Sequence, residues 1–423
     1  MKKYIICGFL ASIMALEGSA QSSTNSAYSQ YGLGVLADAS QGFSRGMNGA
    51  GLGLRKGNVV NALNPASYSA IDSLTMIFDV GLSGHITNFQ EGETKVNAKN
   101  GSFEYAVGSF RLMRHLGIGF GILPYSNVGY KYASNNVVSD MTGAQTNVKE
   151  THSGDGGLRQ VFVGAGWQAM PQLSVGVNVG YLWGTVNRSV VTSGSSSIKA
   201  LTKNYSASVN SYMLDFGLQW MQPMKNGDML TFGATVGLGH KLSGDPTCQI
   251  LEADTTTFVV EKGFSVPMTY SVGVAWNHGA GLMVDADFTL QKWGSLDFPH
   301  YNAETEHYEA MSGLLKDRMQ LRAGADYVPD AYSRKFLSRV HYRCGFGFTT
   351  PYYNINGVDG PKEFSVSAGF GIPLQNAHNN RSVFNVSAQW AHTSAKDLIT
   401  ENTFRINVGL TFNERWFAKW KIE

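Results

Sequence analysis

The sequence predicts an all-β fold: a fourteen-stranded antiparallel transmembrane β-barrel with an N-terminal plug in its lumen. Three observations predict it. From Leu74 onward, apolar and polar residues alternate with a period of two in one short segment after another. Short connections rich in turn residues alternate with longer polar ones, as in barrels of outer membranes. A compact stretch with too many glycines for a stable helix precedes the first strand.

The first twenty residues are predicted to be a cleaved secretory signal peptide. Lys2 and Lys3 form a basic region, an apolar region follows from Tyr4 to Leu16, and Gly18-Ser19-Ala20 is a small-residue cleavage site. The mature chain would begin at Gln21. No run of eighteen apolar residues follows, so no transmembrane helix is predicted. Export together with alternating strands predicts the bacterial outer membrane as the location.

The composition excludes some partners. The formal charge of +2, with 15% charged residues, gives no basis for nucleic-acid binding. Outside the signal peptide only Cys248 and Cys344 remain. A disulfide between them is open to the chain but not favoured, because Cys344 falls within a predicted strand and Cys248 in a loop. Forty-nine glycines and 12% aromatic residues are high for a soluble domain and ordinary for a large barrel.

Residues 21–73 are predicted to form an N-terminal extension and the plug, or hatch. Its centre is the glycine-rich stretch from Gly46 to Ser67. Within this stretch, Asn64-Pro65-Ala66-Ser67 has the pattern of an N-cap followed by proline at the first helical position, which predicts a single helical turn.

Residues 74–412 are predicted to form the barrel, and residues 413–423 a periplasmic tail. The last strand, 404–412, alternates most clearly, whereas apolar residues change parity midway through 101–113. Between the first strand, which starts at Leu74, and the last, twelve more are predicted: 101–113, 116–133, 157–170, 173–193, 203–221, 229–243, 264–277, 280–293, 317–328, 337–350, 361–373 and 381–392.

Connection lengths predict the orientation. Short connections such as 114–115 and 171–172 are assigned to the periplasm, and the longest ones, 134–156 and 294–316, are expected to cover the outer mouth. Both termini would then be periplasmic, and the plug would enter the lumen from that side. The apolar strand faces would meet lipid. Aromatic residues near strand ends are predicted to form the two interfacial belts: Tyr181, Trp183, Trp220, Trp276, Trp293, Trp390, Trp416 and Trp420.

The inward strand faces combine glycine with charge. Glycine weakens a strand interior unless another backbone approaches it closely, so the many inward glycines predict close packing against the plug. The charged side chains predicted to face the lumen are Asp79, Asp215, Asp285, Asp287, Asp326, Arg322, Arg343 and Arg405. Because unpaired buried charges are costly, we expect them to pair with one another and with Arg45, Arg55 and Lys56 of the plug. The alternative is that they receive the carboxylate of a passing ligand.

No enzyme or metal site stands out. Gly42-Phe-Ser44-Arg-Gly46 matches a nucleophile elbow and Gly32-Leu-Gly34-Val-Leu-Ala37 a dinucleotide fingerprint, but neither has the neighbouring strand and helix that the chemistry requires. The loop from His300 to Glu309 could bind a divalent cation, although its composition also fits a solvated acidic loop. We therefore predict no catalytic residue, no metal and no cofactor.

Several stretches resemble the FadL-type outer-membrane transporters of hydrophobic compounds. Arg45-Gly46-Met47-Asn48-Gly49-Ala50-Gly51, followed by Asn64-Pro65-Ala66, resembles the hatch of that family. The stretch from Pro267 to Trp276, followed by Asp287 to Trp293, is similar to its mid-barrel hairpin. The resemblance implies fourteen strands and a hatch along the mature chain. The outer loops are polar here, whereas those of the transporters form an apolar groove. The tail from Asn413 to Trp420 resembles the ends of barrels from Bacteroidota.

The resemblance implies two functions. The first is passive passage of hydrophobic or amphipathic small molecules, such as fatty acids. Release would follow displacement of the hatch, or a lateral gap at a strand kinked by Pro124, since proline removes a ladder donor. The second is a FadL-like subunit of an outer-membrane secretion or assembly complex. The expected partners are a hydrophobic small molecule or lipid, outer-membrane lipid and, for the second function, other outer-membrane or periplasmic proteins.

Overall fold

The computed structural model describes residues 23–139, 145–193, 201–252, 254–279, 281–302, 304–355, 357–374 and 382–414. The predicted signal peptide, 1–20, lies outside these residues, as does the tail beyond Glu414 with Trp416 and Trp420. Within the described part of the chain, no helix is both long and apolar enough to cross a membrane.

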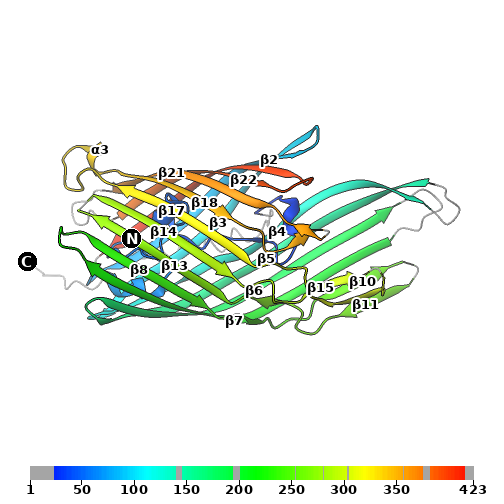
Figure 1. Ribbon diagram of the computed structural model, residues 1–423, viewed down its shortest axis with the longest axis horizontal. Coiled ribbons are helices and arrows are strands. Elements are labelled where there is room, and N and C mark those ends of the chain that lie inside the picture. The colour runs from blue at the N-terminus through cyan, green and yellow to red at the C-terminus, as the bar shows by residue number, and fades with distance from the viewer. Residues whose placement is uncertain are drawn as a thin grey trace, which may run out of the picture.

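The chain forms a closed antiparallel barrel of fourteen strands, as predicted (Figure 1). Strands that follow one another in the chain pair side by side, and the first pairs with the last from Met76–Glu414 to Gln90–Thr400. The barrel strands are β2 (Met76–Glu91), β3 (Thr94–Met113), β4 (Leu116–Ser139), β5 (Gln145–Met170), β6 (Leu173–Ser193), β7 (Leu201–Pro223), β8 (Met229–Gly237), β13 (Thr269–His278), β14 (Leu282–Gln291), β17 (Arg318–Tyr327), β18 (His341–Thr349), β21 (Lys362–Leu374), β22 (Ser382–Ser394) and β23 (Thr400–Glu414).

Side chains alternate between an outward apolar face and the lumen. In β23, Phe404, Ile406 and Phe412 are exposed on the outside, whereas Asn407 and Thr411 are buried inside. This is the arrangement that a bilayer requires, because hydrocarbon offers no partner to polar groups. Both cysteines of the described residues are free: Cys344 lies on the outward face of β18, and Cys248 is buried at the outer end of the barrel.

The strand that contains 101–113, in which the apolar residues change parity, has a β-bulge. Gly81 pairs with Tyr105 and Leu82 with Phe103, so Glu104 has no partner across the ladder. Glu104 and Tyr105, although consecutive, are therefore both buried in the barrel interior.

The two ends of the barrel differ in their connections. One end has short turns, such as 114–115, and a longer turn that holds α3 (Phe336–Arg339). The other end has long hairpins. We call these the periplasmic end and the outer end, following the usual arrangement of such barrels. The β4, β5, β6 and β7 strands are 24, 26, 21 and 23 residues long, against 9 or 10 for β8, β13, β14, β17 and β18.

These long strands project well beyond the others at the outer end (Figure 1). The prediction of a loop at 134–156 is wrong, since most of these residues extend the β4–β5 hairpin; the β2–β3 hairpin is extended in the same way. Beyond the hydrocarbon zone both faces of a strand can be polar, so the alternation that reveals a strand in the sequence is absent.

Short strands complete the outer end, and β10 joins the projecting part of β7. They are β9 (His240–Lys241), β10 (Thr247–Leu251), β11 (Thr255–Val259), β12 (Ser265–Val266), β15 (Phe298–Asn302), β16 (His307–Met311), β19 (Asn354–Ile355) and β20 (Val358–Asp359). The connections that carry them turn apolar side chains inward against β4–β7. We call this buried cluster the outer lid: Tyr28, Leu33, Val128, Leu158, Leu182, Leu242, Phe264, Trp293, Phe298, Leu315, Tyr352 and Tyr353.

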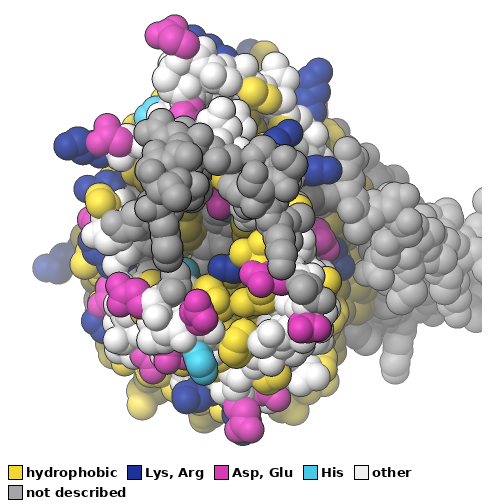
Figure 2. Space-filling view, turned by 90° about the vertical axis from the view of Figure 1, so that its right-hand side faces the viewer, with side chains coloured by type: hydrophobic (Ala, Val, Ile, Leu, Met, Phe, Trp, Pro, Cys, Tyr) yellow, Lys and Arg dark blue, Asp and Glu magenta, His cyan; other side chains and the backbone are white. Residues whose placement is uncertain are grey.

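The outer lid corrects two expectations. Trp293, predicted for an interfacial belt, is fully buried in the lid, where its ring lies 4.7 Å from that of Tyr352. The loops that read as polar also have an apolar side, which faces the barrel interior. Figure 2 looks onto this end: charged side chains surround the rim, and hydrophobic side chains gather in the central hollow.

The N-terminal segment runs from the outer half of the barrel to the periplasmic end. It contains η2 (Ala27–Gln30), β1 (Val35–Leu36), α2 (Gly42–Arg45) and η3 (Pro65–Ala70). Next to η2, Ser29 Oγ and Gly129 N lie 3.1 Å apart, and the Tyr132 hydroxyl donates to Gln30. The prediction that the plug enters from the periplasm is thus wrong for its first described residues, which lie in the outer half.

Candidate functional site

Residues 38–71, which we call the hatch, pack against inward faces all around the barrel. Wall glycines let the two backbones touch. A Cβ on Gly233 would overlap the Leu52 carbonyl, and one on Gly345 would overlap the Met47 carbonyl. The other wall glycines whose Cβ would overlap hatch atoms include Gly117, Gly166, Gly176 and Gly324. The inward glycines therefore allow the close approach that a side chain would prevent.

The predicted helical turn anchors the end of the hatch. The Asn64 side chain caps η3 by accepting from Ala66 N at 3.1 Å, and Pro65 occupies the first helical position. The Asn64 amide also donates to the carbonyls of Leu52 and Leu218, both at 3.0 Å. A single side chain thus caps the turn, joins two parts of the hatch and ties them to β7.

Polar side chains of the wall hold the hatch backbone. The Asp287 carboxylate on β14 accepts from Gly51 N at 2.7 Å and from Leu52 N at 3.0 Å. On β7, Gln219 donates to the carbonyls of Leu52 and Leu54, each at 3.1 Å. These contacts fix the glycine-rich centre of the hatch from two strands.

Asn48 holds a second part of the hatch. Its amide donates to Ser365 Oγ on β21 at 2.8 Å, and its carbonyl oxygen accepts from Gln389 on β22 at 2.7 Å. Gly46 and Gly49 lie on either side of these contacts: Ser367 donates to the Gly46 carbonyl, and Arg322 to the Gly49 carbonyl.

Ion pairs connect the hatch to the wall. Arg45 reaches Glu104 at 2.9 Å, Lys56 reaches Asp326 at 3.0 Å, and Arg322 reaches Asp38 at 3.2 Å. Burial opposes ionisation of Asp38, but Arg322 and Arg45 outweigh it and hold the pKa of this carboxyl below its usual range.

Arg55 differs from these residues because its partners are neutral. It donates to Ser69 Oγ at 2.9 Å and to Gln219 Oε1 at 3.3 Å. Burial therefore lowers the pKa of Arg55 to about 10. The expectation that all three plug cations pair with the predicted lumen carboxylates is correct only for Lys56, because Arg45 pairs with Glu104.

The other predicted lumen charges also face inward. Arg343 joins Asp326 at 2.9 Å, and Asp79 accepts from the Tyr105 hydroxyl at 3.1 Å. Asp285 is fully buried next to Asp287 on the same face of β14. Asp215 and Arg405 line the cavity described next.

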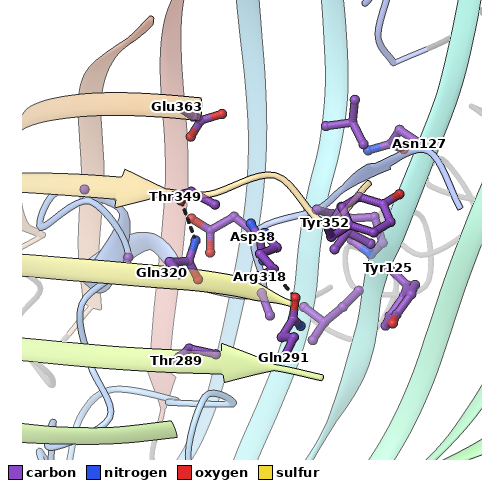
Figure 3. Close-up of a pocket in the computed structure, with 18 of the residues that line it drawn as sticks. Asp38, Tyr125, Asn127, Thr289, Gln291, Arg318, Gln320, Thr349, Tyr352 and Glu363 are labelled. Carbon is purple, nitrogen blue, oxygen red and sulfur yellow. Dashed lines mark hydrogen bonds between the residues drawn. The ribbon is translucent and has the colours of Figure 1, made fainter. Parts of the chain in front are cut away.

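A cavity of about 450 Å³ lies between the outer lid and the hatch. Figure 3 shows part of its lining, with Asp38 of the N-terminal segment opposite residues of β14, β17 and β21. Arg318 donates to Gln291 at 3.1 Å, and among the described residues no carboxylate lies within ion-pair distance of it. Tyr125 and Tyr352 border the same space (Figure 3). Charges of both signs line it, the carboxylates being Asp38, Glu104, Asp215, Asp287, Glu363 and Glu401 and the arginines Arg318, Arg322 and Arg405. The cavity thus combines acidic, cationic and aromatic surfaces, and Arg318 is a cation of this lining without an ion-pair partner among the described residues.

The barrel wall has a seam next to this cavity. Pairing between β3 and β4 stops at Ala106–Ile122, although both strands continue toward the outer end. There β4 bulges at Tyr125, since Pro124 pairs with Arg159 and Ser126 with Leu158. The kink therefore lies at the predicted proline.

The start of the N-terminal segment fills this seam. Strand β1 pairs with Ser126 and Asn127 of β4. On the opposite side, Asn25 donates to Asn100 and Ser102 donates to the Ser23 carbonyl, both at 3.2 Å. Residues on both sides of the seam, among them Ser102 and Asn127, line the cavity, so the segment 23–36 separates the cavity from the outside of the barrel.

A second cavity, of about 240 Å³, lies at the periplasmic side of the hatch. Phe43 and Lys56 of the N-terminal segment line it together with Asp326, His341 and Arg343 of the wall. The hatch therefore lies between two spaces and separates them by the contacts described above.

The family model described as BamG matches the whole chain, residues 1–423. The chain belongs to the BamG family. No curated relative matches it.

Several solved structures share the fold of this BamG-family chain. The toluene transporter TbuX of Ralstonia pickettii is 15% identical, with a TM-score of 0.60 over 88% of this chain and 98% of its own. A FadL homologue of Pseudomonas aeruginosa is 11% identical, with a TM-score of 0.60 over 89% and 99%. The toluene transporter TodX of Pseudomonas putida is 14% identical, with a TM-score of 0.59 over 90% and 100%. At these identities the likeness concerns the fold.

In this BamG-family barrel, sequence reasoning missed Asp38, Glu104 and Gln219, which hold the hatch. The parity change in β3 was the available signal for Glu104, because it marks the bulge. Nothing in the sequence pattern distinguished Asp38 or Gln219 from other polar residues. Among the described residues no group of His, Cys, Asp or Glu has the arrangement of a metal site.

The Arg45–Glu104 pair gives a stability prediction. Both side chains are buried, so Arg45→Ala leaves an uncompensated carboxylate and should weaken docking of the hatch by about 3–5 kcal/mol. Limited proteolysis of the N-terminal segment and the thermal transition of the folded barrel would measure this. The Arg45→Ala/Glu104→Ala variant should recover part of the loss. A double variant as weak as the sum of the two single variants would contradict a direct pair.

Proposed function

We propose that this barrel lets small amphipathic molecules carrying an acid group, fatty acids among them, cross the outer membrane by way of the lumen cavity. The observation that carries the proposal is the seam between β3 and β4, since it places a weak point of the wall directly beside the cavity. A barrel with a structural role alone does not require an interruption of the β3–β4 hydrogen-bond ladder at this position.

The cavity supports this class of molecule. Its volume of about 450 Å³ falls within the range of small-molecule sites, roughly 300–1,000 Å³. Arg318 has donors that no carboxylate of the described chain occupies, and Tyr125 and Tyr352 offer apolar surface nearby. A ligand whose acid group binds Arg318 and whose apolar part lies against the two tyrosines would contact both the cation and the aromatic surface. TbuX and TodX are toluene transporters, and the charges in this cavity favour a more polar ligand than toluene.

The release step would use the seam. The segment 23–36 closes it through hydrogen bonds, the two-residue strand β1 and the side chains of Tyr28 and Leu33 in the outer lid. The hatch is held in addition by buried ion pairs and by close contact with wall glycines. Opening at the seam therefore breaks no ion pair among the described residues, and local opening is easiest where the fewest strong contacts must break. Withdrawal of this segment would connect the cavity to the lipid beside β3 and β4.

A reversible cross-link tests the seam. Val35 and Asn127 are opposite each other in the β1–β4 ladder, a geometry compatible with a disulfide, so Val35→Cys/Asn127→Cys is made in a Cys248→Ala/Cys344→Ala background. Uptake of labelled oleate into proteoliposomes should fall to the protein-free level on oxidation and return on reduction. The single variant Val35→Cys, treated with the same oxidant, is the control. Uptake that persists in the oxidised double variant contradicts the seam route, and protein-free rates under all conditions contradict passage itself.

A second function is favoured by the outer lid. The place where a hydrophobic molecule would enter from outside is filled by the aromatic side chains of the chain itself, including Trp293 and Tyr353. The β4–β7 strands also project as a broad sheet. Both features suit a subunit of an outer-membrane complex. Purification in mild detergent separates the two functions, because a stoichiometric protein partner supports the complex and a copurified lipid or fatty acid supports passage.

A further inference from the structure

The periplasmic turn between β17 and β18 has an unusual surface. Tyr332 is 97% exposed, Leu337 68% and Phe336 51%. Arg334 and Lys335 are exposed between them, Arg339 follows, and Asp330 is the only acidic residue of the turn. Large apolar side chains left in water are costly, and three cations with one carboxylate attract an anionic partner.

The turn has a defined structure. Asp330 N donates to the Ser338 carbonyl at 2.8 Å, which closes the turn, and Tyr332 N donates to the Asp330 carboxylate at 2.9 Å. The Lys335 amide donates to Ser333 Oγ at 3.2 Å, just before α3 begins at Phe336. The apolar and basic side chains are therefore presented by an ordered backbone.

One contact places α3 against the lipid-facing surface. The Tyr342 hydroxyl donates to the Leu337 carbonyl at 3.0 Å. Tyr342 lies on the outward face of β18, since its neighbour Arg343 is buried in the lumen and its own ring packs against exposed Phe370 with centroids 5.8 Å apart. Its ladder partner Tyr327 is 50% exposed. Figure 1 shows α3 at the periplasmic end, outside the ring of strands.

We propose that the turn 329–340 is a phospholipid-binding site that seats α3 in the headgroup layer of the periplasmic leaflet. Its apolar side chains continue the outward aromatic surface of Tyr327, Tyr342 and Phe370, which already meets lipid. Phe336 and Leu337 enter the boundary between headgroups and acyl chains, and the cations Arg334 and Lys335 meet lipid phosphates. Continuity with the lipid-facing surface and the excess of positive charge both favour a lipid surface over a protein partner.

The test places a fluorescent label at the turn. Leu337→Cys is labelled in a Cys248→Ala/Cys344→Ala background, and the full barrel is inserted into nanodiscs of phosphatidylcholine with phosphatidylglycerol. Lipid spin-labelled near the headgroup should quench this label at least about twice as strongly as a label at Asn226→Cys, on another turn of the same end, while aqueous iodide should show the reverse order. Replacing Arg334 and Lys335 by glutamine should reduce the lipid quenching, most in discs that contain phosphatidylglycerol.

Two results would overturn the proposal. The proposal requires iodide to quench the label at Leu337 less than the label at Asn226. Equal or greater iodide quenching at Leu337 places the turn in water and contradicts the proposal. Protection of the label from iodide in native membranes but not in lipid nanodiscs also contradicts the proposal, because a protein partner then covers the turn. Tyr332→Cys, at the most exposed position of the turn, replaces Leu337→Cys if that variant does not fold, and is judged by the same criteria.

Discussion

Deleting residues 31–66 should leave a folded barrel with raised ion conductance. The ladder closes between β2 and β23 without help from this segment, so the wall keeps its pairing. The deletion removes most of the hatch, and with it the buried ion pair of Arg45 and the contacts of Asp287. Because a fourteen-stranded wall encloses more space than its inward side chains fill, conductance in planar bilayers should rise by at least about tenfold.

The control keeps the hatch and removes only the beginning of the segment. Deleting residues 23–30 breaks the contacts of Ser29 and Gln30 with β4 but leaves those of Asn48, Asn64 and Asp287. This variant should show raised uptake of oleate with little change in ion conductance. Unchanged conductance after deletion of 31–66, in a barrel that remains folded, would show that the hatch does not obstruct the lumen.

Adding side chains at two wall glycines should push the hatch out of place. In Gly233→Val/Gly345→Val, each Cβ overlaps a hatch carbonyl, Leu52 on one side and Met47 on the other. Valine suits a strand, so the wall itself is not strained. Overpacking costs about 1–3 kcal/mol at each position, and the two sites should add to roughly 2–6 kcal/mol of lost hatch docking. Proteolysis of the N-terminal segment and conductance should both increase.

The matched control is Gly84→Val/Gly101→Val. These two glycines lie in barrel strands, where they pair with each other across β2 and β3. A Cβ on Gly84 meets nothing within 4 Å, and one on Gly101 meets only the Ser83 carbonyl at 3.8 Å. The control should retain native proteolysis and conductance. If the two double variants behave alike, close approach at Gly233 and Gly345 does not hold the hatch.

The sequence predicted the wall because the bilayer imposes a simple rule on it. In β23, apolar side chains at every second position follow from lipid on one side alone, and this signal recurs often enough to count the strands. Beyond the lipid-facing part of a strand, the alternation of apolar and polar residues stops. The alternation therefore predicts a loop from 134 to 156, which in the structure holds the end of β4 and the outer half of β5. It also predicts a belt position for Trp293, which is buried in the outer lid.

The candidate site was harder to predict, because its pairs depend on register. The inward carboxylate Asp326 could be recognised from alternation, but its partner Lys56 lies far away in the sequence. Glu104 could not be placed inside without the bulge that turns it there. The sequence predicts a lateral gap at a strand kinked by Pro124 but not the segment that fills the seam, because β1 is two residues long and has no sequence signature.

The most direct test of the account is the rate at which labelled oleate enters proteoliposomes that contain the intact mature chain. We expect uptake above the protein-free rate, abolished by the Val35–Asn127 cross-link and increased in Gly233→Val/Gly345→Val. Uptake equal to the protein-free rate, in both the intact protein and the glycine variant, would contradict passage through a lumen controlled by the N-terminal segment.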